Sequence, residues 1–273
     1  ELAPKTSIWN AVAANNIEFV KELLISGEDV NAKAGTHGGS PLHATGMFGR
    51  KECAEFLIAK GADVNAKDDR GETALDWAIF AYDWEQPEVK AAKKETADLL
   101  RKLGGKHGTI CGAAGGGDVE AVKEFLAAGT GVNIRDKSYH KTPLDWAVEH
   151  DKPETSGLLR KHGGKTSEEL KAEESIHDAA RFGITEAIKQ HLAAGTDVNA
   201  KDKDGFTPLI QAVQRGQKEV AKLLIEKGAD VNAKTAKGGT PLDWANAGNH
   251  SETADLLRKH GGKTGEELKA EGK

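Results

Sequence analysis

A pattern of about 33 residues recurs along this chain, and its clearest copy spans residues 204–234. In that copy the turn dipeptide Asp204-Gly205 precedes Thr207 and Pro208. A threonine followed by proline typically begins a helix, because the hydroxyl caps a free N–H and proline lacks one. The next apolar residues fall at the spacing of one helical face, and they are Leu209, Ala212 and Val213. The copy therefore begins with a short amphipathic helix.

A second helix is predicted after Gly216, and it ends at Gly228. Its apolar residues are Val220, Leu223, Leu224 and Ile225. The following run, residues 229–233, is too short and polar for a helix and leads into the next turn. Two short helices cannot bury their own apolar faces, so each copy needs a stacked neighbour.

This copy closely resembles the ankyrin repeat, whose period is near 33 residues and whose core reads T-P-L-H-x-A. The residues that carry the resemblance are Gly205, Thr207-Pro208-Leu209, Ala212, Gly216, Glu219, Leu223-Leu224 and 228–232. The position of Leu209 recurs at Ile8, Leu42, Leu75, Ile110, Leu144, Ile176 and Leu242. The resemblance implies an all-α ankyrin-repeat α-solenoid, built of helix-turn-helix pairs with β-hairpin fingers. We expect a single array of eight repeats over residues 1–273, more similar to bacterial than to animal ankyrin proteins.

Three copies share a variant ending. The sequence Leu-Asp-Trp-Ala at 75–78, 144–147 and 242–245 leads each time to Leu-Leu-Arg-Lys-x-Gly-Gly-Lys. Thr166 and Thr264 then stand three residues before a glutamate, which is a capping box, so a short helix is expected in place of a finger. We therefore divide the array into sub-blocks 1–108, 109–174 and 175–273. The three tryptophans are interpreted as packing between repeats.

Repeat three contains ten extra residues around positions 80–87, between its two helices. We expect Pro87 to begin the second helix and the first helix to run longer. A longer first helix would carry Phe80, Tyr82 and Trp84 outward. These aromatics would then either cover the lengthened helix pair or contact a partner, because Trp and Tyr are favoured anchors in interfaces.

Repeat four contains Gly115, Gly116 and Gly117 at the end of its first helix. Each of the first two glycines destabilises a helix by about 1 kcal/mol relative to alanine. We therefore expect the fastest hydrogen exchange among the internal repeats here. The alternative is that the glycines form a flat patch without side chains on the concave surface.

Charge and cysteine content narrow the class of function. The net charge of −5 gives no electrostatic reason to expect nucleic acid binding. Cys53 and Cys111 lie in different repeats, so two thiols are expected. No apolar run approaches the roughly 18 residues of a transmembrane helix. We expect a soluble protein, cytoplasmic or exported with its leader removed, since the chain begins at Glu1 without a methionine.

No motif in the sequence supports catalysis or cofactor binding. Gly-Lys-Thr at 164–166 and 262–264 resembles the end of a phosphate-binding loop, but Leu159 and Leu257 occupy the position of the required glycine. The ten histidines show no metal-site spacing with cysteine. We predict a protein that is not an enzyme and that needs no cofactor or metal.

Function is therefore expected on the surface. The resemblance implies that a concave face, made by finger tips and first helices, binds another protein, and we expect the chain itself to be a monomer. The candidate partner-binding residues are Met47, Phe48, Arg70, Phe80, Tyr82, Trp84, Tyr139, His150, Phe182, Phe206 and Arg215. The alternative is a recognition domain of a larger effector or enzyme whose other domain is absent from this chain.

Overall fold

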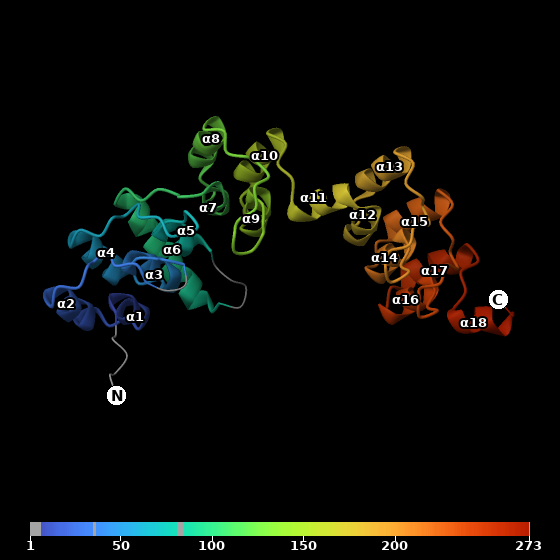
Figure 1. The fold of residues 1–273 in the computed structure, drawn as a ribbon, viewed down its shortest axis with the longest axis horizontal. Helices are drawn as coiled ribbons and strands as arrows, with labels where there is room; N and C mark the ends of the chain where they lie inside the picture. The colour runs from blue at the N-terminus through green and yellow to red at the C-terminus, as the bar shows by residue number, and fades with distance from the viewer. Residues whose placement is uncertain (1–6, 35–36, 81–84, 273) are drawn as a thin grey trace. The chain divides into compact units, whose positions relative to one another are not determined.

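A computed structural model of the chain describes residues 7–34, 37–80 and 85–272. The contacts between Cα atoms group the chain into two compact units, Glu1–Thr166 and Ser167–Lys273. Both units consist of short helices joined by turns (Figure 1). The fold is the predicted all-α arrangement of stacked helix pairs.

The first unit contains five helix pairs in its described residues. They are α1 (Ile8–Ala13) with α2 (Ile17–Ile25), α3 (Pro41–Phe48) with α4 (Lys51–Ala59), α5 (Ala74–Ile79) with α6 (Pro87–Lys102), α7 (Ile110–Gly116) with α8 (Val119–Ala127), and α9 (Pro143–Glu149) with α10 (Pro153–Lys161). The first helices α1, α3, α5, α7 and α9 pack one on the next. This succession gives the repeat stacking that the sequence period predicts.

The second unit begins with α11 (Ser167–Glu174), which packs against α12 (Ile176–Phe182) and α13 (Thr185–Ala193). Two further pairs follow, α14 (Pro208–Gln214) with α15 (Lys218–Glu226) and α16 (Pro241–Ala247) with α17 (Ser251–Lys259), and α18 (Gly265–Ala270) ends the unit. Helices α11 and α18 confirm the short helices predicted after the Gly-Gly-Lys segments. The division into three sub-blocks stays a prediction.

The predicted helix starts are confirmed by their caps. The Thr207 hydroxyl accepts a hydrogen bond from the N–H of Ile210, and Pro208 is the first residue of α14. The capping box before α18 is formed, since Glu267 accepts from the N–H of Thr264 at 2.7 Å and donates its own N–H to the Thr264 hydroxyl at 3.2 Å.

The fingers take the form of tight turns, and the described residues form no regular strand. One isolated antiparallel bridge joins Ala34 and Gly39. In each of the other fingers a backbone hydrogen bond joins the two ends of the turn, from the N–H of Asp68 to Glu72, of Asp136 to Lys141, of Asp202 to Phe206 and of Thr235 to Gly239. The hairpins that the resemblance implies are therefore present as turns.

Five repeats end with an asparagine whose side chain links that repeat to the next one. The side-chain amide of Asn65 donates to the carbonyl of Gly104 at 3.1 Å, and its oxygen accepts from the N–H of Lys106 at 2.7 Å. The same pair of bonds is made by Asn31, Asn133, Asn199 and Asn232. These bonds fix the register of neighbouring repeats where no strand ladder does so.

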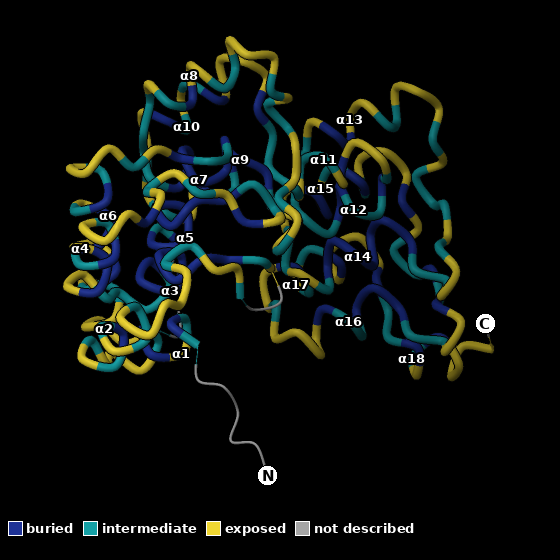
Figure 2. The backbone as a smooth tube through the Cα atoms, turned by 60° about the vertical axis from the view of Figure 1, so that its left-hand side comes forward, coloured by how far each residue is buried: buried dark blue, intermediate teal, exposed yellow. Residues whose placement is uncertain are grey.

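The buried residues follow the first helices, which are the most deeply buried parts of both units (Figure 2). The second unit has one apolar core cluster, from Ala172 to Leu257. The first unit has two, one from Ile8 to Leu100 and one that joins Phe80 to residues 110–159. The core of the first unit therefore divides between repeats three and four.

The prediction for the insertion in repeat three is partly wrong. Pro87 begins the second helix as expected, but the first helix α5 ends at Ile79 and the lengthened helix is α6, with 16 residues. Phe80 caps α5 and is only 6% exposed, because its ring packs on Trp146 at 4.5 Å between centroids. It therefore points inward. Tyr82 and Trp84 lie outside the described residues.

Candidate protein-binding surface

The fingers of repeats three and five are in direct contact, although repeat four lies between them in the sequence. Repeat four begins with the short segment 104–108 and has no finger of its own. The Arg70 guanidinium donates to the Ser138 hydroxyl, and the Lys137 ammonium donates to the carbonyl of Asp69 at 3.4 Å. A missing finger thus brings residues from two non-adjacent repeats onto one surface.

Arg70 is held in place by its neighbours. Its Nε donates to Asp68 Oδ2 at 3.0 Å, and its Nη2 lies 2.8 Å from Glu72 Oε2. The guanidinium also lies over the ring of Trp77 at 5.3 Å, and the Trp77 indole N–H donates to Asp68 at 3.2 Å. The side chain is therefore part of a rigid wall, since planar stacking and several hydrogen bonds restrict it together.

The two carboxyl groups beside Arg70 have opposite pKa shifts. Burial raises the pKa of Glu72 to about 7, although the positive charge of Arg70 acts to lower that pKa. Burial would also raise the pKa of Asp68, but hydrogen bonds from the Glu72 N–H and from Arg70 outweigh it and lower that pKa. Asp68 therefore carries the permanent negative charge that holds Arg70.

Four of the predicted partner-binding residues line one small cavity of about 110 Å³ in the first unit. They are Met47, Arg70, Phe80 and Tyr139, from repeats two, three and five. Glu72 and Trp77 complete much of the wall. The structure thus brings together residues that are up to 92 positions apart in the sequence.

Tyr139 is the exposed member of an aromatic cluster next to this cavity. Its side chain is 38% exposed, and its ring meets Trp146 edge-on with centroids 5.4 Å apart. Trp146 in turn contacts Phe80 and His150, and its indole N–H donates to Asp136 at 3.0 Å. Buried rings on one side therefore hold an exposed tyrosine in a fixed position.

The remaining predicted residues lie elsewhere. Phe48 is half-buried and packs edge-on against Trp9 at 5.7 Å. In the second unit, Phe182 and Arg215 line a cavity of about 420 Å³ together with Arg181. Phe206 packs on Trp244 at 5.1 Å. Their roles in binding stay predictions.

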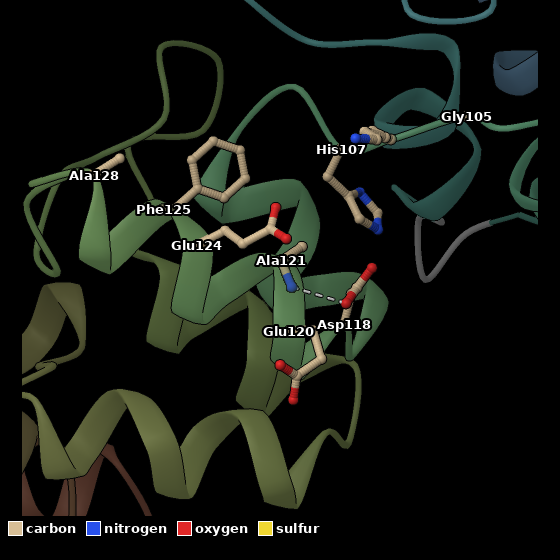
Figure 3. A pocket seen from close by; sticks show the side chains of 9 residues that line it. Gly105, His107, Asp118, Glu120, Ala121, Glu124, Phe125 and Ala128 are labelled. Atoms are coloured by element: carbon tan, nitrogen blue, oxygen red, sulfur yellow. Dashed lines mark hydrogen bonds between the residues drawn. The ribbon is translucent and has the colours of Figure 1, made fainter.

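One pocket was not predicted from the sequence. It has a volume of about 400 Å³ and lies between the 105–107 segment and α8 (Figure 3). Its carboxylates are Asp118, Glu120 and Glu124, and Phe125 and His107 also line it. Asp118 caps α8 and Glu120 pairs with Lys123 at 2.6 Å, so these two groups already have local partners.

His107 lines this pocket with an unusual hydrogen-bond pattern. Its Nδ1 lies 2.7 Å from Asp76 Oδ1, and both side chains are fully buried. Its Nε2 is buried, and none of the described residues forms a hydrogen bond with it. No local sequence pattern indicates this pair, because the two residues are 31 positions apart in repeats with different finger lengths.

Two kinds of site are absent from the residues that the structure describes. Among these, no three His, Cys, Asp or Glu side chains are arranged to hold a metal ion. Within the same ranges, no helix has the length and apolar content needed to cross a bilayer. The buried thiols Cys53 and Cys111 are unpaired, and burial raises the pKa of both.

Comparison with known proteins identifies the family. A family model for ankyrin repeats in three copies matches residues 8–89 and 176–267. The chain is 29% identical over 194 residues to the mitochondrial disaggregase of Bos taurus, which covers 68% of this chain and 27% of that protein. It is 28% identical over 217 residues to the B-cell lymphoma 3 protein homolog of Mus musculus, covering 77% of this chain and 48% of that protein.

A third relative is similar in the same way. The chain is 27% identical over 182 residues to the transient receptor potential cation channel subfamily A member 1 homolog of Caenorhabditis elegans, covering 66% of this chain and 15% of that protein. The chain thus spans less than half the length of each of these three relatives. The family match covers more than half of the chain, and its helix pairs stack as the repeat requires. The chain belongs to the ankyrin repeat family.

Proposed function

We propose that this chain is a protein-binding scaffold without catalytic activity, and that it recognises a partner protein with the surface around Tyr139 in its first unit. Ankyrin repeats mediate protein–protein interaction, and arrays of this family are generally non-catalytic. The observation that carries the proposal is the position of Tyr139, which is 38% exposed and backed by the buried rings of Phe80 and Trp146.

A tyrosine held in this way is suited to binding. A preformed aromatic side chain loses little conformational entropy on association, and interface energy concentrates in a few such residues. Met47 supplies an adaptable apolar side chain beside it. Arg70 is fixed by Asp68 and Glu72, so we assign it to shaping the surface.

The experiment is affinity capture from a lysate of the source organism, with two double variants that melt like the wild type. Met47→Ser/Tyr139→Ser alters the proposed surface, and Phe182→Ser/Arg215→Ser alters the cavity of the second unit as a matched control. Loss of an anchor of 2 kcal/mol weakens binding by roughly 30-fold. We expect a protein that the wild type and the control retain and that the first variant loses.

Two results would contradict the proposal. Retention of the same protein by the Met47→Ser/Tyr139→Ser variant would exclude the Tyr139 surface as the binding site. Loss in the Phe182→Ser/Arg215→Ser variant alone would move the site to the second unit. His150, Phe48 and Phe206 can then be tested singly against the same partner.

A second proposal is that the chain acts as the recognition part of a larger protein. It is supported by the relatives, since the chain spans 27% of the bovine disaggregase and 48% of the mouse homolog. An immunoblot of the source organism tests it. A band far heavier than 29.0 kDa supports it, and a single band at that mass contradicts it. In either case we expect the isolated chain to sediment as a monomer.

A further inference from the structure

The junction between repeats three and four is open on the side of the second helices. Neighbouring second helices pack in the pairs α2 with α4, α4 with α6, and α8 with α10, whereas α6 and α8 form no comparable contact. The apolar core of the first unit divides at the same place. The row of second helices is therefore interrupted between α6 and α8, while the first helices α5 and α7 still pack on each other.

A cavity of about 290 Å³ lies in this opening. One wall is the face of α6 that carries Lys90, Lys94 and Arg101. His150 and Lys152, in the turn between α9 and α10, also line it, and so do Gly115 and Gly116 at the end of α7, the part that we call its floor. We call this cavity the lysine pocket.

The lysine pocket is strongly positive. Among the described residues that line it Asp98 is the only carboxylate, and it pairs with Arg101 at 3.2 Å. Lys90, Lys94 and Lys152 form no ion pair with any of the described residues. This local excess of positive charge stands in a chain whose net charge is −5. Three unpaired ammonium groups around one cavity raise the local concentration of anions.

The floor of the pocket has no side chains, although packing does not require this at Gly115. A Cβ there would lie 3.4 Å from Ile79 Cγ2 and 3.6 Å from Trp146 Cβ, which are ordinary contacts. At Gly116 a Cβ would lie 2.9 Å from the His107 ring, so glycine is required there. Gly115 thus keeps the floor open at a cost of about 1 kcal/mol in helix stability.

We propose that the lysine pocket binds carboxylate side chains from an acidic segment of a partner protein. The volume fits a few side chains rather than a polymer backbone, and the positive charge is confined to one cavity instead of forming the stripe that nucleic acid binding needs. Lysine ammonium groups act as mobile point charges, which suits carboxylates that approach from several directions. The site goes beyond the Tyr139 surface, and one member of the aromatic cluster beside that surface, His150, also lines the lysine pocket.

The experiment measures fluorescence anisotropy of a fluorescein-labelled deca-glutamate peptide with the full chain at low salt. The test variant is Lys90→Gln/Lys94→Gln/Lys152→Gln. The control is Lys189→Gln/Lys218→Gln/Lys222→Gln, which removes the same charge from second helices where each lysine pairs with a glutamate. We expect at least about tenfold weaker binding in the test variant and less than about twofold in the control, because unpaired charges in a cavity are screened least.

A further variant separates shape from charge. Gly115→Gln puts an uncharged side chain on the floor and is expected to weaken binding of the same peptide about as much. Equal weakening by the test and control triples, or no peptide binding by the wild type, would overturn the proposal. Tighter binding of a labelled deca-thymidylate under the same conditions would overturn it in favour of nucleic acid. Met47→Ser/Tyr139→Ser should leave peptide binding unchanged, so failure of one site is distinguishable from failure of the other.

Discussion

Helices α5 and α16 carry the same Leu-Asp-Trp-Ala sequence but differ in what surrounds it. In both, the aspartate forms a capping box with the preceding threonine and accepts a hydrogen bond from a glycine N–H of the next segment, Gly108 or Gly265, at 2.9 Å. In α5 the Asp76 carboxylate also holds buried His107, and Trp77 donates to Asp68. In α16 the buried Trp244 N–H has no acceptor within the part of the chain that the structure describes.

The difference comes from residues outside the motif. The finger before α5 supplies Asp68, whereas Thr235 occupies the corresponding position before α16. The segment after α6 supplies His107, whereas the segment after α17 leads into α18. The Leu-Asp-Trp-Ala motif thus determines the helix and its cap. The residues outside the motif determine how many buried polar groups form hydrogen bonds.

The largest effect is expected from removing the aspartate of each helix. Asp76→Ala leaves buried His107 and two backbone N–H groups without an acceptor, so it should destabilise the first unit by about 3–5 kcal/mol. Asp243→Ala removes a more exposed cap and should destabilise the second unit by about 1–2 kcal/mol. Urea denaturation gives both values, with hydrogen exchange assigning each loss to its unit. Equal losses of unfolding free energy in the two units would show that the Asp76–His107 pair adds no stability.

The next effect is a pH dependence confined to the first unit. Burial raises the pKa of Glu72 in the folded chain from its ordinary value of 4.5 to about 7, so ionisation opposes folding. Its stabilising contribution is fully present below pH 4.5 and is lost as the pH rises to about 7, a change of roughly 3 kcal/mol at most. Gly239 stands at the corresponding position before α16 and cannot titrate.

The measurement is the free energy of unfolding of the first unit between pH 4.5 and 7.5, for the wild type and Glu72→Gln. In the variant, most of the decline in the free energy of unfolding should be absent. A decline of equal size in Glu72→Gln would mean that another group causes it.

The second unit should behave in the opposite sense at lower pH, because the hydrogen bond from Arg258 lowers the pKa of Glu267 to about 2. That contribution is present above pH 4.5 and is lost as the pH falls toward 2.

A smaller effect is expected from giving Trp244 an acceptor. Thr235→Asp places a carboxylate at the position where Asp68 accepts from Trp77 and Asp136 accepts from Trp146. The new hydrogen bond should stabilise the second unit by about 1 kcal/mol. Trp244 is the only tryptophan of that unit, so its fluorescence during urea unfolding reports the change directly. Asp136→Thr is the reverse control and should destabilise the first unit. No gain in Thr235→Asp would show that the orphan N–H costs little.

The sequence allowed prediction of what is local and periodic. Helix starts at Pro208, Pro87 and Thr264 follow from capping chemistry that acts within four residues. The stacking follows from the period, because apolar faces of equal spacing must meet. The capping of α3 is equally local, since His43 contacts Ser40 three residues before it, whereas its contact with the carbonyl of Glu72 joins two repeats.

The candidate surface could be predicted only in part. Met47, Arg70 and Tyr139 were assigned to a common face by repeat position, but the contact of Arg70 with Ser138 depends on a finger that repeat four lacks. Phe80 was expected outside because its insertion was assigned to α5, whereas its burial depends on Trp146, 66 residues later. Contacts that skip a repeat have no signal in the repeat pattern, so sequence reasoning missed them.

The smallest effect is expected from replacing glycines of α7, the first helix that packs on α5. Gly115→Ala should stabilise the first unit by about 0.5–1 kcal/mol, because alanine favours the helix and its Cβ meets only ordinary contacts. Gly112→Ala is the matched contrast, since its Cβ would lie 1.9 Å from Asp76 Oδ1 and must displace the carboxylate that holds His107. Urea denaturation should therefore give changes of opposite sign for two Gly→Ala substitutions three residues apart. Slower hydrogen exchange of α7 in Gly115→Ala would show that helix propensity limits this repeat; an unchanged rate would place its weakness in the divided core beside it.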